Sequence, residues 1–536
     1  MAPRRAGHVH GERVRGAGIR RRWSQASQRA GGATSGHGRR CDGTQAGNRA
    51  AGSGRADRPR TGAPVAGPQV QLGAVSRRLT VSLGVALVVV GVACGGSGPE
   101  LPARTPGPAG AASPGLAADW AEYHHDAARS GVGPASPALS SASSPPRVAW
   151  TTGLDGDVYA SPLIVAGHVL VATENNTVYS LDLFSGAVVW KVHLGEPVNA
   201  ASLQCGDIGP VTGITGTPAA DAGAGRLYVV AFLRSHHHML FTLSLADGST
   251  VAQRDIDPAG SDPAVQQQRG ALALGSGYVY IPLGGLFGDC GQYNGYLEAV
   301  PVGGGPALSY RVPSARGAGV WDPAGATIAP SGSVYIVTGN GASRSSFDYS
   351  NSVVELSADL QHVQSYFAPA DWISLNAGDT DLGSVGATLL PSPGVVLAIG
   401  KQGVAYLLTA DRLGGIGGQI ASRPVCSGAF GGTAWSKDTV YVPCSDGLYA
   451  LTVRTTSIDV IWHASHPSLG SPVLAAGDVW AIEPGSGRLY ALDPESGDVV
   501  YSTALGSAQH FSTPAATEGF IVAPAGDKIV TVATAA

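Results

Sequence analysis

Charged side chains are scarce in this sequence. They make up 13% of the 536 residues, and four lysines stand against 77 glycines. Long amphipathic helices need Glu, Lys and Arg on the face exposed to water, so the composition argues against a fold built from them. Frequent Gly, Val, Thr and Tyr is instead typical of many short strands joined by tight turns.

Positive charge is especially scarce beyond the first 78 residues. Residues 1–78 hold 16 of the 34 Lys and Arg residues and only three of the acidic ones. The rest of the chain has 18 basic and 35 acidic residues, a net charge of −17. Binding to phosphates needs a basic face, so we expect no nucleic acid partner for this part, and it should repel anionic partners.

Residues 1–78 lack the hydrophobic periodicity that could bury a core. We interpret them as a basic low-complexity segment that is disordered or not translated, and an RNA-binding tail is the alternative. Methionine occurs only at Met1 and Met239, so a translation start closer to residue 79 would use a codon other than ATG, for example at Val75.

An export signal is predicted directly after this segment. Arg77 and Arg78 form a positive n-region. Residues 79–93 form an apolar stretch of signal-peptide length, which is too short for a comfortable membrane span. We therefore expect the protein to lie outside the cytoplasm.

The end of the apolar stretch, Gly91-Val-Ala-Cys94, is similar to a bacterial lipobox, with Gly91 where such motifs usually have Leu. We expect a signal peptide over 79–94 and a lipid on Cys94, which would be the only link to a membrane. A plain secretory signal, and hence a freely secreted protein, is the alternative. Residues 95–117 are rich in Pro, Gly and Ala and are expected to form a flexible linker.

One pattern recurs from residue 146 onward. Small residues precede an apolar strand, then come a Gly turn, a second strand, a third strand ending in Leu-Asp, a Ser-Gly turn and a fourth strand that often ends in Trp. The eight copies start near Ser161, Thr217, Gly270, Ala326, Ala387, Thr433, Ser471 and Thr513. Four strands in each of eight units predict an all-β fold, an eight-bladed β-propeller of four-stranded antiparallel blades over residues 118–536.

The last unit has room for only three strands between Thr513 and about Val532. Residues 147–152 form a lone predicted strand ahead of the first complete unit. If this strand pairs with the last blade, it closes the ring and removes an open sheet edge. This closure favours eight blades over seven.

The cysteine content predicts disulfides. Two of the six cysteines lie in the N-terminal segments, which leaves Cys205, Cys290, Cys426 and Cys444, an even number in an exported protein. Cys426 and Cys444 belong to one repeat unit, so we expect them to pair, and Cys205 then pairs with Cys290; free buried thiols are the alternative. The sequence has neither C-x-x-C-H nor a C-x-x-C zinc spacing, so we expect no haem and no zinc.

The repeat resembles the PQQ-type propeller repeat of quinoprotein alcohol dehydrogenases, which also occurs in non-catalytic exported propellers. The resemblance covers about 120–536, and its nearest branch is similar to polyvinyl-alcohol dehydrogenase. Residues 120–131, Trp-Ala-Glu-Tyr-His-His-Asp-Ala-Ala-Arg-Ser-Gly, are similar to the segment that leads into such propellers. The repeat alone implies the fold and leaves the function open.

Further motifs extend this resemblance to a site. Residues 319–340, from Gly-Val-Trp321 to Thr-Gly-Asn340, are similar to the quinoprotein stretch whose Trp stacks on the quinone and whose Asn ligates calcium. Asp379-Thr-Asp381 and the following Lys401 are similar to the region with the catalytic Asp and a Lys that contacts the quinone.

The resemblance implies a coherent chemistry. Calcium prefers oxygen ligands, which would come from Asn340 and from Asp289, where the family has Glu. Asp381, or Asp379, would accept the alcohol proton as general base, and Lys401 would bind carboxylates or quinone oxygens of PQQ. The cofactor carries out the oxidation and the protein orients it.

The sequence also departs from these dehydrogenases. It has no adjacent Cys-Cys pair and no haem domain, so a separate electron acceptor would be needed. The matched residues also have ordinary structural roles, Trp321 in blade packing and the others in turns. Two functions therefore stay open: an exported module that binds an unknown ligand or protein at the channel mouth or rim, or a PQQ- and calcium-dependent dehydrogenase of alcohols or polyols.

Two histidine clusters complete the candidates. His236-His-His238 could bind a metal, but three adjacent strand residues cannot all face one ion. We therefore favour a polar hairpin tip there. His124 and His125 are interpreted as part of the ordered segment ahead of the first blade.

Overall fold

A computed structural model describes the chain over residues 119–134, 138–139, 144–465 and 468–534. The predicted basic segment, signal peptide, lipidation site at Cys94 and linker lie outside these residues. Within the described part, no helix has the length and apolar character needed to cross a membrane.

The first complete blade follows the predicted strand pattern. Its strands are β2 (Leu163–Val165), β3 (His168–Ala172), β4 (Thr177–Asp182) and β5 (Val188–His193), paired in this order and all antiparallel. The first three strands are buried almost throughout because neighbouring blades cover both of their faces, whereas β5 is largely exposed. The first strand is therefore the innermost and the fourth the outermost.

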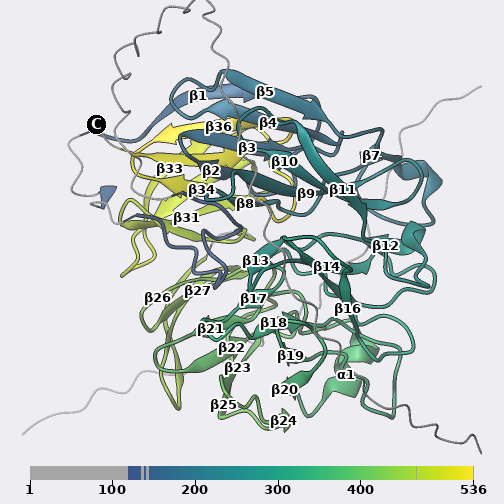
Figure 1. Cartoon of the computed structure of the whole chain (residues 1–536). Helices are drawn as coiled ribbons and strands as arrows, with labels where there is room; N and C mark the ends of the chain where they lie inside the picture. Colours follow the sequence, from purple (N-terminus) through teal and green to yellow (C-terminus); the bar gives the residue numbers. More distant parts are fainter. Residues whose placement is uncertain (1–118, 135–137, 140–143, 466–467, 535–536) are drawn as a thin grey trace, which may run out of the picture. The chain divides into compact units, whose positions relative to one another are not determined.

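Seven further sheets repeat this arrangement around the ring (Figure 1). The second blade contains β8 (Ala219–Asp221), β9 (Arg226–Phe232), β10 (His238–Ser244) and β11 (Thr250–Asp255). The third contains β13 (Ala273–Gly275), β14 (Tyr278–Gly285), β15 (Tyr296–Pro301) and β16 (Leu308–Arg311). The fourth contains β17 (Thr327–Ile328), β18 (Val334–Val337), β19 (Val353–Leu356) and β20 (Val363–Ala368). The fifth blade contains β21 (Thr388–Leu390), β22 (Val395–Ala398), β23 (Val404–Thr409) and β25 (Ala421–Pro424). The sixth contains β26 (Ala434–Ser436), β27 (Thr439–Cys444), β28 (Gly447–Val453) and β29 (Ile458–Ala464). The seventh contains β30 (Val473–Ala475), β31 (Asp478–Glu483), β32 (Arg488–Leu492) and β33 (Val499–Ala504).

The eighth blade closes the ring as the sequence predicts. It contains β34 (Ala515–Thr517), β35 (Phe520–Pro524) and β36 (Lys528–Ala533), and its outer strand is β1 (Arg147–Gly153) from the other end of the propeller. The pairing of β1 with β36 is antiparallel, and the two strands lie together in Figure 1. The eight-bladed all-β fold is thereby confirmed.

A few elements depart from the four-strand pattern. Two blades gain a fifth strand of two residues, because β12 (Gln266–Gln267) pairs with β14 and β24 (Gly415–Ile416) runs parallel to β20. The pair β6 (Val198–Asn199) and β7 (Val211–Thr212) lies outside the blades. The described helices are α1 (Trp372–Gly378) and two short 3-10 turns, Ala200–Ser202 and Pro263–Val265.

Tryptophans within three outer strands dock one blade on the next. Each indole lies against a glycine in the Ser-Gly or Asp-Gly turn of the following blade and donates its Nε1 hydrogen to a backbone carbonyl there; for Trp150 the acceptor is Leu183, at 2.8 Å. A Cβ on the facing Gly186 would lie 2.5 Å from Trp150, so only glycine fits. The three pairs are Trp150 with Gly186, Trp190 with Gly248, and Trp462 with Gly497.

The segment 119–134 fills the central channel. Trp120 pairs with Ile164 in the innermost strand of the first blade, and Arg129 donates to the carbonyls of Leu272 and Ala326 beside the third and fourth. Further along, Gly131 accepts a hydrogen bond from Leu474 in the seventh blade. Because these bonds use the edges of inner strands that face the ring axis, the segment crosses and blocks the channel.

Candidate functional site

The predicted site residues lie at one mouth of the channel. In every blade the chain enters the innermost strand from the same side, and the second strand ends on that side because the two are antiparallel. Trp321 precedes β17, Asp381 precedes β21, and Lys401 follows β22. Equivalent positions in neighbouring blades therefore bring these three residues to one mouth.

Three of the predicted residues contact one another directly. The Lys401 Nζ lies 2.7 Å from Oδ1 of Asp381, and the Trp321 Nε1 donates to Oδ2 of the same carboxylate at 3.2 Å. The Lys401 ammonium also lies over the Trp321 indole, 5.3 Å from the ring centroid. Asp379 joins from the surface, with its Oδ1 3.0 Å from Lys401 Nζ.

Glycines permit this close approach. A Cβ at Gly339 would lie 2.8 Å from the Trp321 Nε1 and 3.0 Å from Asp381 Oδ2. A Cβ at Gly400 would lie 2.5 Å from the Asp381 carbonyl oxygen, to which Lys401 donates its backbone N–H at 2.9 Å. The contact between Asp381 and Lys401 is thus fixed by backbone as well as side-chain bonds.

Burial and charge act in opposite directions on this ion pair. Asp381 has no exposed surface, and burial raises the pKa of its carboxyl against the effect of the Lys401 ammonium. Burial lowers the pKa of Lys401, but the carboxylates of Asp381 and Asp379 outweigh this effect and raise it overall. Lys401 therefore keeps its positive charge at the mouth.

The residues predicted to bind calcium are separated by a strand-like segment. Gly317 donates its N–H to the Tyr293 carbonyl on one side, and Ala318 donates to the Asn340 carbonyl on the other. The exposed Asp289 lies on the Tyr293 side, where the Tyr293 hydroxyl donates to its carboxylate. Burial is the main cause that raises the pKa of the Tyr293 hydroxyl, and the negative charge of Asp289 acts in the same direction.

Calcium and a quinone would each have to displace contacts that Asp289 and Lys401 already make. The Asp289 carboxylate already accepts a hydrogen bond from the Tyr293 hydroxyl, so it would have to give up this bond to ligate calcium. A planar ring stacked on the indole face beneath Lys401 would have to displace the ammonium. Trp321, Asp381 and Lys401 are brought together as the sequence predicts, with Asp379 beside them, whereas Asp289 is not.

Both predicted disulfides are present. Cys205 is bonded to Cys290 and Cys426 to Cys444, across 85 and 18 residues of sequence. The first holds the loop that carries Asp289. The second lies next to the hairpin of Lys401, because the Cys426 N–H donates to the Gly403 carbonyl at 3.3 Å.

An arginine at the same mouth is not among the residues predicted from the sequence. Arg269 precedes β13, lies over the rings of Phe511 (5.2 Å to the centroid) and Tyr159 (5.9 Å), and donates to the His510 carbonyl at 3.3 Å. Among the described residues, no carboxylate lies within ion-pair distance of its guanidinium. Its place just before Gly270, a repeat start, is the sequence signal that could have found it.

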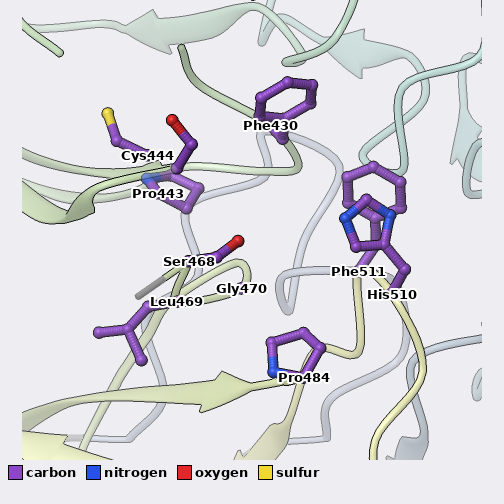
Figure 2. Close-up of a pocket in the computed structure, with 10 residues that line it drawn as sticks. Phe430, Pro443, Cys444, Ser468, Leu469, Gly470, Pro484, His510 and Phe511 are labelled. Carbon is purple, nitrogen blue, oxygen red and sulfur yellow. The ribbon is translucent and has the colours of Figure 1, made fainter. Parts of the chain in front are cut away.

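A largely apolar pocket of about 240 Å³ lies at this mouth, lined by residues of the sixth and seventh blades and of the segment ahead of the eighth (Figure 2). Phe430 forms one wall, and the Ala429 N–H next to it donates to the Gly400 carbonyl beside Lys401. Phe511 also lines the pocket, and Arg269 lies over its ring. The remaining lining residues are Pro443, Cys444, Ser445, Ser468, Leu469, Gly470, Pro484 and His510.

Comparison with known proteins identifies relatives of the fold. The PQQ_2 family model, described as outer membrane protein assembly factor BamB, matches residues 138–385 and 449–536. No curated protein sequence matches the chain.

Several solved structures share the fold at low identity. Quinohemoprotein alcohol dehydrogenase ADHIIG from Pseudomonas putida HK5 is 14% identical with a TM-score of 0.64, over 78% of this chain and 80% of that one. A europium-containing methanol dehydrogenase is 14% identical with a TM-score of 0.60, over 79% and 98%. BamB from Moraxella catarrhalis is 13% identical with a TM-score of 0.50, over 72% and 99%. At such identities the likeness establishes the fold alone.

Proposed function

Because this chain belongs to the PQQ_2 family of β-propeller repeat proteins, we propose that it is a binding module whose ligand, a small aromatic carboxylate, occupies the channel mouth. The pocket supplies apolar walls for a ring, and Arg269 lies against the ring of Phe511 in its lining, where it could receive a carboxylate. Lys401, whose ammonium is paired with Asp381 and Asp379, is the second cation near the pocket, next to the backbone that precedes Phe430. Ligand sites in proteins usually combine an apolar cavity with a few placed polar groups in this way.

The observation that carries this proposal is that Arg269 has no carboxylate within ion-pair distance among the described residues. Its guanidinium is only partly exposed, contacts aromatic rings and has no carboxylate partner among the described residues. Arginine forms paired hydrogen bonds with carboxylates, and a partly desolvated cation gains most from such a partner. The charges of Glu174 and Asp207 act on Arg269 only from beyond ion-pair distance, so a ligand carboxylate would supply the direct partner that it lacks.

The closed channel supports the same proposal. The segment 119–134 blocks the channel beneath the mouth, and the Tyr123 hydroxyl lies 3.4 Å from Oγ1 of Thr513 at the start of the last inner strand. A ligand in the pocket is therefore held in a cavity that is closed at the bottom, and not in an open pore. The net negative charge of the propeller opposes anions at long range, so recognition must depend on the two local cations.

Calorimetry with matched ligands tests this function. We would titrate the purified protein with PQQ and simpler aromatic mono-, di- and tricarboxylates, and with the neutral amide of each. We expect saturable binding of at least one carboxylate and at least tenfold weaker binding of its amide, because a charge-assisted hydrogen bond is lost. Equal binding of acids and amides, or none by either, would refute the proposal.

A PQQ- and calcium-dependent dehydrogenase of alcohols or polyols is the second candidate. The observation that favours it is the contact of Trp321, Asp381 and Lys401, the three residues that the quinoprotein resemblance assigned to quinone and base. Bound PQQ would supply the oxidising group. Lys401 would then leave the indole face to bind its oxygens, and Asp381, freed from the pair, would accept the proton of the substrate hydroxyl.

Reconstitution separates the two candidates. The protein is incubated with PQQ and calcium, and reduction of an artificial dye by alcohols or polyols is measured, since the chain would need an external acceptor. Binding of PQQ without dye reduction supports the module and rejects the enzyme. Dye reduction that is lost in Asp381→Asn but retained in Asp371→Asn, an exposed acidic control, supports the enzyme.

The cellular location is proposed from the cysteines. Two disulfides in one chain support a compartment outside the cytoplasm, where thiols are oxidised. We propose that the protein is held at a membrane by a lipid on Cys94. Mass spectrometry of the purified mature N-terminus tests this, since an acylated Cys94 is expected and a free, uncleaved segment would contradict it.

A further inference from the structure

A second cluster of polar side chains, separate from the residues of the channel mouth, lies on the second blade. Strands β10 and β11 are antiparallel and pair Met239 with Asp255, so the start of one lies beside the end of the other. His237 immediately precedes β10, and Asp257 follows the end of β11 by two residues. The hairpin therefore brings one imidazole and two carboxylates together.

The geometry of these three groups is unusual for a simple ion pair. The Nδ1 of His237 lies 2.9 Å from Oδ2 of Asp255 and 2.9 Å from Oδ2 of Asp257. One nitrogen carries at most one hydrogen, so it cannot donate fully to both carboxylates. Two carboxylates this close also repel each other unless a cation lies between them.

We propose that His237, Asp255 and Asp257 bind a first-row divalent cation such as Zn²⁺. Their ligand atoms all lie within 4.8 Å of one another, close enough to surround one ion. Imidazole nitrogen suits zinc, copper and nickel, whereas calcium and magnesium prefer oxygen alone. Three protein ligands leave a fourth position for water or a partner's side chain.

The surrounding residues hold the ligands in place. The other oxygen of each carboxylate is bonded within the protein: Asp257 Oδ1 lies 2.8 Å from His238 Nδ1, and Asp255 Oδ1 accepts the Asp257 N–H at 2.9 Å. His238 is itself buried and stacked on Phe232, with the ring centroids 4.2 Å apart. Each carboxylate thus turns its remaining oxygen toward His237, as in metal sites whose ligands are oriented by outer hydrogen bonds.

This site differs from the one considered in the sequence. His236 turns away, with a backbone φ of +61° and its Nε2 3.2 Å from the Ser202 hydroxyl, so the three adjacent histidines indeed do not share an ion. The carboxylates come instead from the neighbouring strand. The site also needs no cysteine, so the absence of a C-x-x-C zinc spacing does not bear on it.

Competition with a chromogenic chelator tests this proposal on the full chain, after treatment with EDTA. We expect the wild type to bind one more equivalent of Zn²⁺ than His237→Gln or Asp255→Asn, or to bind that equivalent at least tenfold more tightly. The matched control His236→Gln should bind like the wild type. An excess of Ca²⁺ or Mg²⁺ should not compete.

Thermal unfolding gives an independent readout, because all of these substitutions are at least partly exposed and should leave the fold intact. Added Zn²⁺ should raise the melting temperature of the wild type and of His236→Gln, but not of His237→Gln. Equal zinc stoichiometry and equal thermal shifts in His237→Gln and His236→Gln would overturn the proposal. Displacement of Zn²⁺ by Ca²⁺ would overturn its assignment to this class of metal.

Discussion

Lys401 and Asp381 form an ion pair at the channel mouth, with Nζ 2.7 Å from Oδ1 and the carboxylate completely buried. Removal of one partner of a buried pair leaves an uncompensated charge. Lys401→Met should therefore destabilise the protein by about 3 kcal/mol at pH 8, and by less at a lower pH, because protonation of Asp381 removes the uncompensated charge. Urea unfolding at the two pH values measures this effect.

The double variant Lys401→Met with Asp381→Asn is the control for that prediction. It has no buried charge left at this position, so most of the lost stability should return. If the double variant loses as much stability as the two single variants together, the uncompensated charge is not the cause of the loss in Lys401→Met.

Glu174 predicts a pH dependence of stability. Burial raises the pKa of its carboxyl to about 7, from 4.5; one oxygen accepts from the Gly213 N–H and the Thr215 hydroxyl, and the other has no partner. The folded state thus binds this proton more tightly than the unfolded state does. The stabilisation is complete below pH 4.5 and is lost as the pH rises through 7.

The test of this prediction is Glu174→Gln. The wild type should lose roughly 3 kcal/mol more stability than the variant between pH 4.5 and pH 8, since each unit of pKa corresponds to about 1.4 kcal/mol. Urea unfolding across this range measures the difference. Parallel pH profiles of the two proteins would show that Glu174 ionises normally.

Arg129 should be essential to the segment that blocks the channel. Its guanidinium is buried and donates to the carbonyls of Ala326, Leu272 and Tyr123, and pairs with Glu122. A lysine cannot make all of these bonds, so Arg129→Lys should cost about 3 kcal/mol. Arg234→Lys, in an exposed ion pair, should change stability by less than about 1 kcal/mol. Equal melting temperatures of the two variants would contradict this role.

The two disulfides should differ in their contribution. Cys205–Cys290 spans 85 residues and Cys426–Cys444 spans 18. The chain-entropy model gives about 4–5 kcal/mol for the longer loop and about 3 kcal/mol for the shorter. Replacement of the first pair by alanine should therefore lower the melting temperature more than replacement of the second. The opposite order in calorimetry would contradict this prediction.

Most of the fold could be predicted from local signals. Glycine turns recur along the chain, Tyr-x-Leu-Asp strands mark two of the units (179–182 and 490–493), and the lone strand 147–152 matched the strand missing after Thr513. The path of the segment 119–134 could not be predicted, because Trp120 and Arg129 bond to strands far away in the sequence. The short strands β12 and β24 were likewise not predicted, since two residues carry no periodicity.

The site was predicted less completely. The resemblance brought Trp321, Asp381 and Lys401 together correctly, because each has a fixed place in its blade. It did not reveal that the Tyr293 hydroxyl donates a hydrogen bond to the carboxylate of Asp289. Arg269 was missed because its only sequence signal is its place before a repeat start, and its contacts with the rings of Phe511 and Tyr159 come from segments far away in the sequence.

The most direct test of the proposed binding function compares two arginine variants. We would titrate the best aromatic carboxylate and its amide into the wild type, into Arg269→Gln and into the rim control Arg234→Gln. Our account predicts that Arg269→Gln binds the carboxylate at least tenfold more weakly, binds the amide like the wild type, and that Arg234→Gln behaves like the wild type. Unchanged affinity of Arg269→Gln for the carboxylate would contradict it.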